Sequence, residues 1–157
     1  MFLSNSFYYY LFISNQTGTC GPVYAMERVQ PYSDFFPQIT PSMPWKRRVR
    51  IAKNFIHLLM EFEKSSVGRL VHCDVQEGNF GLTKDLNVKA IDVDLINSPD
   101  RMGEIIEQPE CESDKDCDFF DCIGTCDTVK RKCTKKLTTN NLMVGNLGFY
   151  FIIYFIL

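Results

Sequence analysis

The sequence lacks an excess of charge of either sign. Lysine and arginine together number 17, aspartate and glutamate number 19, and the formal net charge at pH 7 is −2. Proteins that bind nucleic acid normally carry a basic face and a high isoelectric point, whereas the isoelectric point of this chain is about 5.7. We therefore expect no nucleic acid among its partners.

A long uninterrupted apolar run is also absent. The apolar stretch at 2–13 has no basic residue before it, so the segment 1–17 is a poor match to a secretory signal peptide. The apolar stretch at 142–157 has 16 residues, fewer than the roughly 20 that span a bilayer. The five basic residues between 130 and 136 would favour a cytosolic flank if it did span. We expect the tail 137–157 to associate with a membrane without forming a regular span.

The seven cysteines are unevenly distributed. Cys20 and Cys73 stand apart, and the other five lie within 23 residues: Cys111, Cys117, Cys122, Cys126 and Cys133. Dense cysteines in a short polar stretch are typical of disulfide-rich segments in oxidising compartments. We predict two disulfides among these five, with the connectivity open, and at least one thiol that is free or paired elsewhere.

Metal binding is a weaker interpretation of the same stretch. Asp114, Asp116 and Asp118 have the alternating spacing of a calcium loop, but Phe119 replaces the required glycine and Thr125 the required glutamate. Zinc needs two closely spaced cysteine pairs, which this spacing fits only loosely.

The rest of the chain predicts an α+β fold. Four prolines at 31, 37, 41 and 44 make 31–44 a connector. A helix is expected at 45–64, because apolar residues recur there at three- and four-residue steps: Trp45, Val49, Ala52, Ile56, Leu59 and Phe62. The basic residues between them predict a solvated opposite face.

Short strands are expected on both sides of that helix. The range 22–30 is β-prone after a turn at Gly18–Gly21, and 80–83 and 88–96 form a hairpin around a turn at 84–87. The polar stretch 98–136 shows little periodicity, and no internal repeat is present.

One motif carries the chemistry. His72, Asp74 and Asn79 have the spacing H-x-D-x-x-x-x-N, and Asp92 follows thirteen residues after Asn79, beyond the hairpin turn. This is the spacing of a kinase catalytic loop and metal-binding strand. Asp74 would accept or orient the proton of an acceptor hydroxyl. The oxygens of Asn79 and Asp92 suit a hard cation such as Mg²⁺ or Mn²⁺.

Further residues complete this candidate site. His72 is a packing and hydrogen-bonding support of the loop, and Asp94 adds a carboxylate that is either a further metal ligand or a turn constraint. A hinge segment at 22–30, with Met26 and the acidic Glu27, precedes the connector and the long helix, which is the order of elements in a kinase. An unrelated α/β domain that uses Asp and Asn as caps and turn formers is the alternative.

These segments together resemble the divergent protein kinase domain 1 family, the cysteine-rich kinase-like membrane proteins of the endoplasmic reticulum. The resemblance covers roughly residues 18–136 and rests on Cys20-Gly-Pro-Val-Tyr-Ala-Met-Glu27, His72-Cys-Asp-Val-Gln-Glu-Gly-Asn-Phe-Gly81, Ile91-Asp-Val-Asp94 and the cysteine cluster. It implies a partial kinase-like domain with a disulfide-rich segment at 111–133, a lumenal location, and binding of ATP with a divalent metal.

The sequence departs from ordinary kinases in several ways. Cys73 stands where an arginine usually pairs with a phosphorylated activation loop, and Gln76 stands where a lysine usually neutralises the transferred phosphate. No G-x-G-x-x-G loop precedes the hinge segment, and no strand lysine pairs with a helix glutamate. We therefore expect a truncated chain that binds ATP poorly as written.

Three functions remain open at this point. The first is a secretory-pathway enzyme that, in its intact form, transfers phosphate from ATP to a protein substrate of unknown identity. The second is a small-molecule kinase, which shares the H-x-D-x-x-x-x-N pattern but is usually cytosolic. The third is a non-catalytic pseudokinase that serves as a binding module.

Overall fold

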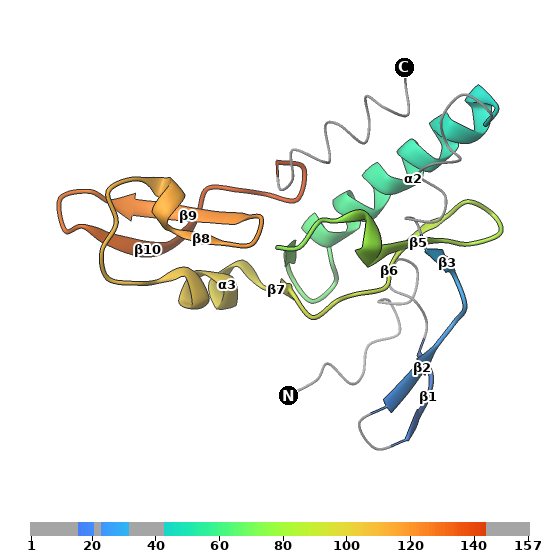
Figure 1. Ribbon diagram of the computed structural model, residues 1–157, viewed down its shortest axis with the longest axis horizontal. Helices are drawn as coiled ribbons and strands as arrows, with labels where there is room; N and C mark the ends of the chain where they lie inside the picture. The colour runs from blue at the N-terminus through green and yellow to red at the C-terminus, as the bar shows by residue number, and fades with distance from the viewer. Residues whose placement is uncertain (1–15, 21–22, 32–42, 144–157) are drawn as a thin grey trace.

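The computed structural model describes residues 16–20, 23–31 and 43–143, and these ranges form an α+β structure with two parts. One part contains the long helix α2 (Trp45–Glu63) and the hairpin of β5 (Phe80–Leu82) and β6 (Val88–Ala90). The other is a cysteine-rich module at the opposite end of the molecule (Figure 1). Most of the segment 1–17, the connector and the tail fall outside the described residues.

The N-terminal described residues form a two-stranded ribbon. Strand β1 (Gln16–Cys20) pairs antiparallel with β2 (Val23–Met26), and Cys20 lies opposite Val23. We had expected a turn at Gly18–Gly21 and one strand over 22–30. Strand β1 continues to Cys20, past the expected start of the turn, and β2 ends at Met26. The end of the expected strand belongs to a separate short strand, β3 (Gln30–Pro31), which pairs with β5.

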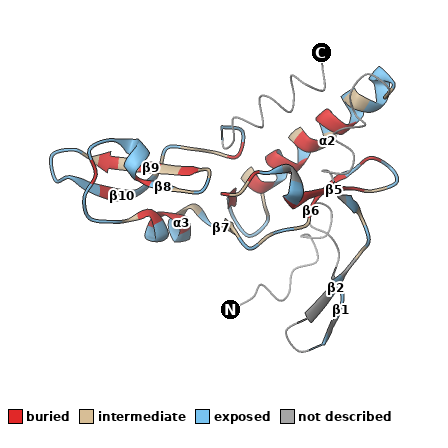
Figure 2. Cartoon of the chain, in the orientation of Figure 1, coloured by how far each residue is buried: buried red, intermediate tan, exposed pale blue. Residues whose placement is uncertain are grey.

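Helix α2 begins after Pro44 and occupies the predicted range. Its buried face carries six side chains: Ile51, Ala52, Phe55, Leu58, Leu59 and Phe62. The predicted apolar stripe was therefore partly wrong, because Trp45 and Val49 are exposed and Ile56 is half-buried. A helix of 19 residues is about 28 Å long, so its first turns extend past the three-residue strands on which it packs (Figure 2).

The hairpin and a second strand pair position the loop at 73–79. Strands β3, β5 and β6 form one antiparallel sheet, and β4 (Val71–His72) pairs with β7 (Ile96–Asn97). The strand expected at 88–96 is shorter, because β6 ends at Ala90. The backbone amides of Ile91 and Asp92 then turn toward the Asn79 carbonyl, at 2.9 and 3.5 Å. Asp92 therefore lies in a loop beside Asn79.

The polar stretch 98–136, which was expected to have little regular structure, forms a small helix and a sheet. Its elements are α3 (Pro99–Ile106), β8 (Asp118–Phe119), β9 (Cys122–Asp127) and β10 (Lys132–Leu137), with a 3₁₀ turn at Asp114–Asp116. Strands β8 and β10 flank β9. Strand β9 alternates inward and outward, but its inward positions are Cys122, Gly124 and Cys126. This strand pattern was missed because cysteine and glycine replace the usual branched apolar residues.

Three disulfides join six of the seven cysteines. Two lie within the module, Cys111–Cys126 and Cys117–Cys133, and the third joins Cys73 to Cys122. Disulfide bonding of the stretch is thus confirmed, and the leftover thiol is the exposed Cys20. Sequence spacing gave no sign of the third bridge, whose partners are 49 residues apart.

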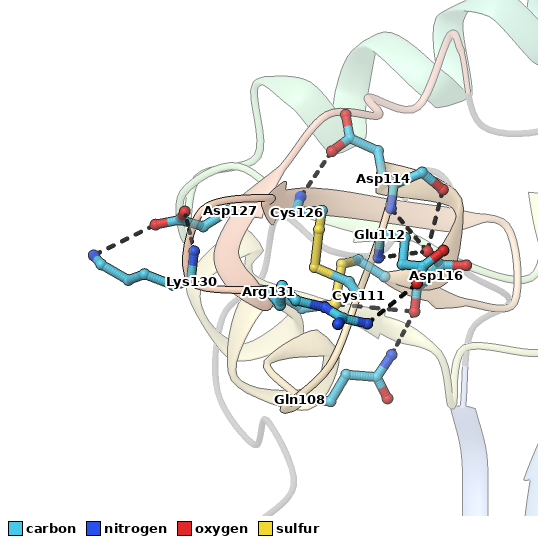
Figure 3. Close-up of a disulfide and its surroundings, with 12 residues drawn as sticks. Gln108, Cys111, Glu112, Asp114, Asp116, Cys126, Asp127, Lys130 and Arg131 are labelled. Carbon is cyan, nitrogen blue, oxygen red and sulfur yellow. Dashed lines mark hydrogen bonds and ion pairs between the residues drawn. A yellow bond between two sulfur atoms is a disulfide. The ribbon is translucent and has the colours of Figure 1, made fainter.

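The acidic side chains of the module bind its own backbone (Figure 3). The Asp114 carboxylate accepts a hydrogen bond from the Cys126 amide at 2.7 Å. The Asp116 carboxylate accepts from the amides of Glu112 and Ser113, and these N–H groups lower the pKa of Asp116. Both carboxylates therefore stabilise the turn around the disulfides.

Residues after β10 contact the module first and then return to the first part. Thr138 and Thr139 exchange hydrogen bonds with the backbone of Ile123, and Asn141 is fully buried beside β4. The structure thus places residues 137–143 with the domain, although the sequence assigned them to the apolar tail. Among the described residues, no helix is long and apolar enough to cross a membrane.

Gly103 sets the closest approach between α3 and β10. A Cβ atom at this position would collide with the Lys135 backbone carbonyl. Alanine normally stabilises a helix by about 1 kcal/mol relative to glycine, but overpacking against backbone costs about 1–3 kcal/mol. We therefore predict that Gly103→Ala lowers the free energy of unfolding, measured by urea denaturation with the disulfides intact. Gly18→Ala, with no atom within 4 Å of its Cβ, is the control; equal effects would contradict the prediction.

Candidate active site

Asp74 and Asn79 lie together at the two ends of the loop between β4 and β5. The Asn79 amide nitrogen donates to the Asp74 carbonyl at 2.9 Å and to Asp74 Oδ2 at 2.6 Å. Asn79 is buried and Asp74 is half-buried. The loop folds this way because a 3₁₀ turn at Glu77–Asn79 brings Asn79 back over Asp74. The amide oxygen of Asn79 consequently stays available for a cation.

Gln76 binds the same oxygen of Asp74. Its side-chain amide donates to Asp74 Oδ2 at 2.9 Å. Both side-chain donors in the described part of the loop therefore hold Oδ2, which leaves Oδ1 as the oxygen for an acceptor hydroxyl. Gln76 thus orients the carboxylate, a function that the comparison with the usual lysine did not suggest.

His72 supports the loop through a hydrogen bond and through the packing of its ring. Its Nδ1 accepts a hydrogen bond from the Asp74 amide at 3.3 Å, so the ring proton lies on Nε2. The ring packs against Phe80 and Phe62, with centroid distances of 5.6 and 6.1 Å. Burial lowers the pKa of His72 to about 4, despite the opposing influence of Asp74 and Asp92. The ring is therefore neutral near pH 7.

The residues expected to hold a cation fit one chemically. Asp92 is exposed, and one of its oxygens accepts the Asp94 amide at 3.2 Å, so Asp94 contributes a turn through its backbone. An amide oxygen and a carboxylate suit Mg²⁺ or Mn²⁺, which retain water and phosphate ligands. Three cysteine sulfurs also lie within 4.8 Å of one another, but all three belong to disulfides: Cys111, Cys117 and Cys126.

The hinge segment contacts the hairpin through an ion pair. Glu27 follows β2, and its carboxylate lies 3.4 Å from Nζ of the buried Lys89 on β6. The side chain of Glu27 is therefore directed at the hairpin. Met26 is the last residue of β2, and its side chain is outside the described part.

The sequence analysis missed two connections between the cysteine-rich module and the loop, a disulfide and the hydrogen bonds of Asp121. Cys73 is bonded to Cys122, and the neighbouring Asp121 contacts the loop twice. Its amide donates to the Cys73 carbonyl at 2.8 Å, and its Oδ2 accepts from the Val75 amide at 2.7 Å. The residues on both sides of Asp74 are thus fixed by the module.

Asn141 makes a third set of contacts that the sequence analysis missed. Its Oδ1 accepts the His72 amide at 3.0 Å, and its Nδ2 donates to the Leu70 carbonyl at 2.7 Å and to Glu63 at 2.9 Å. It therefore joins α2 to the strand that leads into the catalytic loop. Its position in a Thr-Thr-Asn-Asn run before an apolar tail gave no periodic signal.

The sequence of this domain matches a known family. A family model described as the protein-kinase domain of FAM69 matches residues 4–145, and no solved structure matches. The chain belongs to this family of divergent kinases, and it is a kinase-like protein with a disulfide-rich domain. The resemblance to the divergent protein kinase domain 1 family is confirmed. The match also extends nine residues past Lys136, where we had expected the resemblance to end.

We predict that His72 makes folding stability pH-dependent. The unfolded histidine takes up a proton below pH 6.5, whereas the folded one does so only near pH 4. Stability should therefore fall as the pH drops from 6.5 to 4, by about 3 kcal/mol in total, and His72 should add no further loss below pH 4. Urea denaturation across this range measures the slope. His72→Gln should flatten it, and parallel curves for the two proteins would contradict the assignment.

We predict that Asn141→Ala lowers the free energy of unfolding by about 3 kcal/mol, because it leaves buried polar groups without partners. Asn141→Asp should not restore stability, because it places a carboxylate next to Glu63 and loses both donated hydrogen bonds. Asn140→Ala is the control, since within the described ranges that side chain bonds only the nearby amides of Leu142 and Met143. Calorimetry measures all three, and an Asn141→Ala protein as stable as the control would rule out the proposed contact.

Proposed function

We propose that the intact protein transfers the γ-phosphoryl group of ATP to a hydroxyl of a protein substrate, with a divalent metal ion. The observation that carries this proposal is the geometry around Asp74. Two amide donors, from Gln76 and Asn79, hold one carboxylate oxygen. The other oxygen is left to accept a proton, which is the requirement for a general base in phosphoryl transfer.

The proposed step moves one proton to Asp74 and one phosphoryl group to the acceptor. The acceptor hydroxyl gives its proton to Oδ1 of Asp74, and its oxygen forms a bond to the γ-phosphorus. The bond from that phosphorus to the bridging oxygen breaks, and its electron pair leaves with ADP. Asp74 later releases the proton to solvent, to which it is partly exposed.

The metal site would be formed by the Asn79 amide oxygen and the Asp92 carboxylate. When bound, Mg²⁺ or Mn²⁺ supplies positive charge against the phosphate oxygens of ATP. The loop fixes the two ligands relative to each other, because the amides of Ile91 and Asp92 approach the Asn79 carbonyl. The hinge backbone near Glu27 would hold the adenine edge.

The proposed location is the lumenal side of the endoplasmic reticulum membrane. Three disulfides, one of them at the catalytic loop, support an oxidising compartment. Association with the membrane through the flanking apolar segments is part of the same proposal. A small-molecule kinase and a non-catalytic binding module are the alternatives that an experiment must separate.

The intact protein, purified with its disulfides formed, should be assayed for Mn²⁺-dependent ATP binding and for transfer of labelled phosphate to a peptide pool and to a metabolite pool. Asp92→Asn should abolish metal-dependent binding. Asp74→Asn should retain it but lose phosphate transfer by a factor of 10² or more, on the order expected for loss of a general base.

Asp85→Asn, an exposed residue in the hairpin turn, is the matched control and should behave as wild type. Labelled metabolites without labelled peptides would support a small-molecule kinase. Nucleotide binding without transfer to either pool would support a pseudokinase. Absence of metal-dependent ATP binding by the unaltered intact protein would sink the enzyme hypothesis.

A further inference from the structure

The backbone around Asp74 is fixed at every polar group from the Cys73 amide to the Val75 amide. The Cys73 amide donates to the Leu95 carbonyl, the Asp74 amide to His72 Nδ1, and the Asp74 carbonyl accepts from Asn79. The remaining two groups, the Cys73 carbonyl and the Val75 amide, both bind Asp121. A single residue outside the loop therefore completes the hydrogen bonding on both sides of Asp74.

Asp121 is held in place by more than its own hydrogen bonds. It belongs to the tight turn between β8 and β9, in which Phe119 lies opposite Cys122. Phe120 in this turn has a positive φ of 52°, a conformation that bulky side chains rarely adopt and that persists only where the surroundings enforce it. The disulfide from Cys122 to Cys73 anchors the turn covalently to the loop.

The disulfide and the hydrogen bonds of Asp121 restrain the loop in different ways. The disulfide fixes the distance between the turn and the loop at Cys73. It does not by itself orient the peptide plane between Asp74 and Val75, whose carbonyl end accepts from Asn79. The hydrogen bond from the Val75 amide to the Asp121 carboxylate fixes the amide end of the same plane, and it is strong because its acceptor is charged.

We propose that Asp121 is a positioning residue for Asp74: it holds the amide after the catalytic carboxylate, and the carbonyl before it, in the orientation that phosphoryl transfer needs. This inference rests on the proposed function of Asp74. It predicts an effect on the chemical step and little effect on nucleotide binding, because Asn79 and Asp92 are held by contacts that do not involve Asp121.

The test compares Asp121→Ala and Asp121→Asn with the wild type, and Asp118→Ala serves as the matched control. Asp118 is an exposed residue on β8 of the same module, so its substitution makes the same change of charge without touching the loop. Amide hydrogen exchange of Val75, followed by NMR on the full disulfide-bonded chain, reports on the positioning directly. Phosphate transfer with varied ATP reports on its consequence.

Asp121→Ala should raise the exchange rate of the Val75 amide by on the order of tenfold or more. It should lower kcat by roughly ten- to a hundred-fold, because small misplacements of a catalytic group are costly, while KM for ATP stays unchanged. Asp121→Asn should recover part of both losses, since its amide oxygen can still accept from Val75. Asp118→Ala should match the wild type in both measurements.

The outcomes separate this inference from the proposed function. If the wild type transfers no phosphate, the proposed function fails, and the exchange of Val75 still shows whether Asp121 holds the loop. If Val75 exchanges equally in all four proteins, the positioning inference fails whatever the activity. A loss of kcat in Asp121→Ala that Asp121→Asn does not relieve at all, or that Asp118→Ala reproduces, would also overturn it.

Discussion

The Cys73–Cys122 disulfide is the constraint on which the arrangement of the two parts depends. It closes a loop of 49 residues, for which the chain-entropy model gives a stabilisation of about 4 kcal/mol. Within the described residues, the cysteine-rich module has its own sheet, its own two disulfides and its own helix. The third disulfide places this module against the catalytic loop. The contacts of Asp121 with the loop follow from that placement.

A network of hydrogen bonds around Asn141 also links the segment after the module to the first part. Asn141 returns from the module and binds the carbonyl of Leu70, the amide of His72 and the carboxylate of Glu63. Buried amides of this kind stabilise only when all their groups are paired, and here both the oxygen and the nitrogen are used. The strand before the loop and the residues around Asp74 are therefore both tied to the segment that follows α3. The loop is short, but its geometry depends on Asn141, which lies 69 positions from His72 and 71 positions from Leu70.

The comparison of sequence and structure shows which parts of the fold are encoded locally. Helix α2 and the β5–β6 hairpin were predictable, because periodicity and turn residues act over a few positions. The grouping of Asp74 with Asn79 was predictable from a fixed loop spacing. Strand β9 was not, because its inward residues are cysteine and glycine. The contacts of Cys73, Asp121 and Asn141 were also hidden, since they join residues 46 to 78 positions apart, and no local pattern specifies such pairings.

Cys73 is held by a disulfide, and this type of bond determines the conditions under which the site keeps its geometry. An arginine at this position, as in ordinary kinases, forms an ion pair that the addition or removal of a phosphate can make or break. A disulfide has no such dependence: it persists wherever the compartment is oxidising and is lost wherever thiols are kept reduced. On the proposed function, the geometry of the catalytic loop would thus depend on location rather than on phosphorylation. The same bond would hold Asp74 against the module and restrict the folded site to an oxidising compartment.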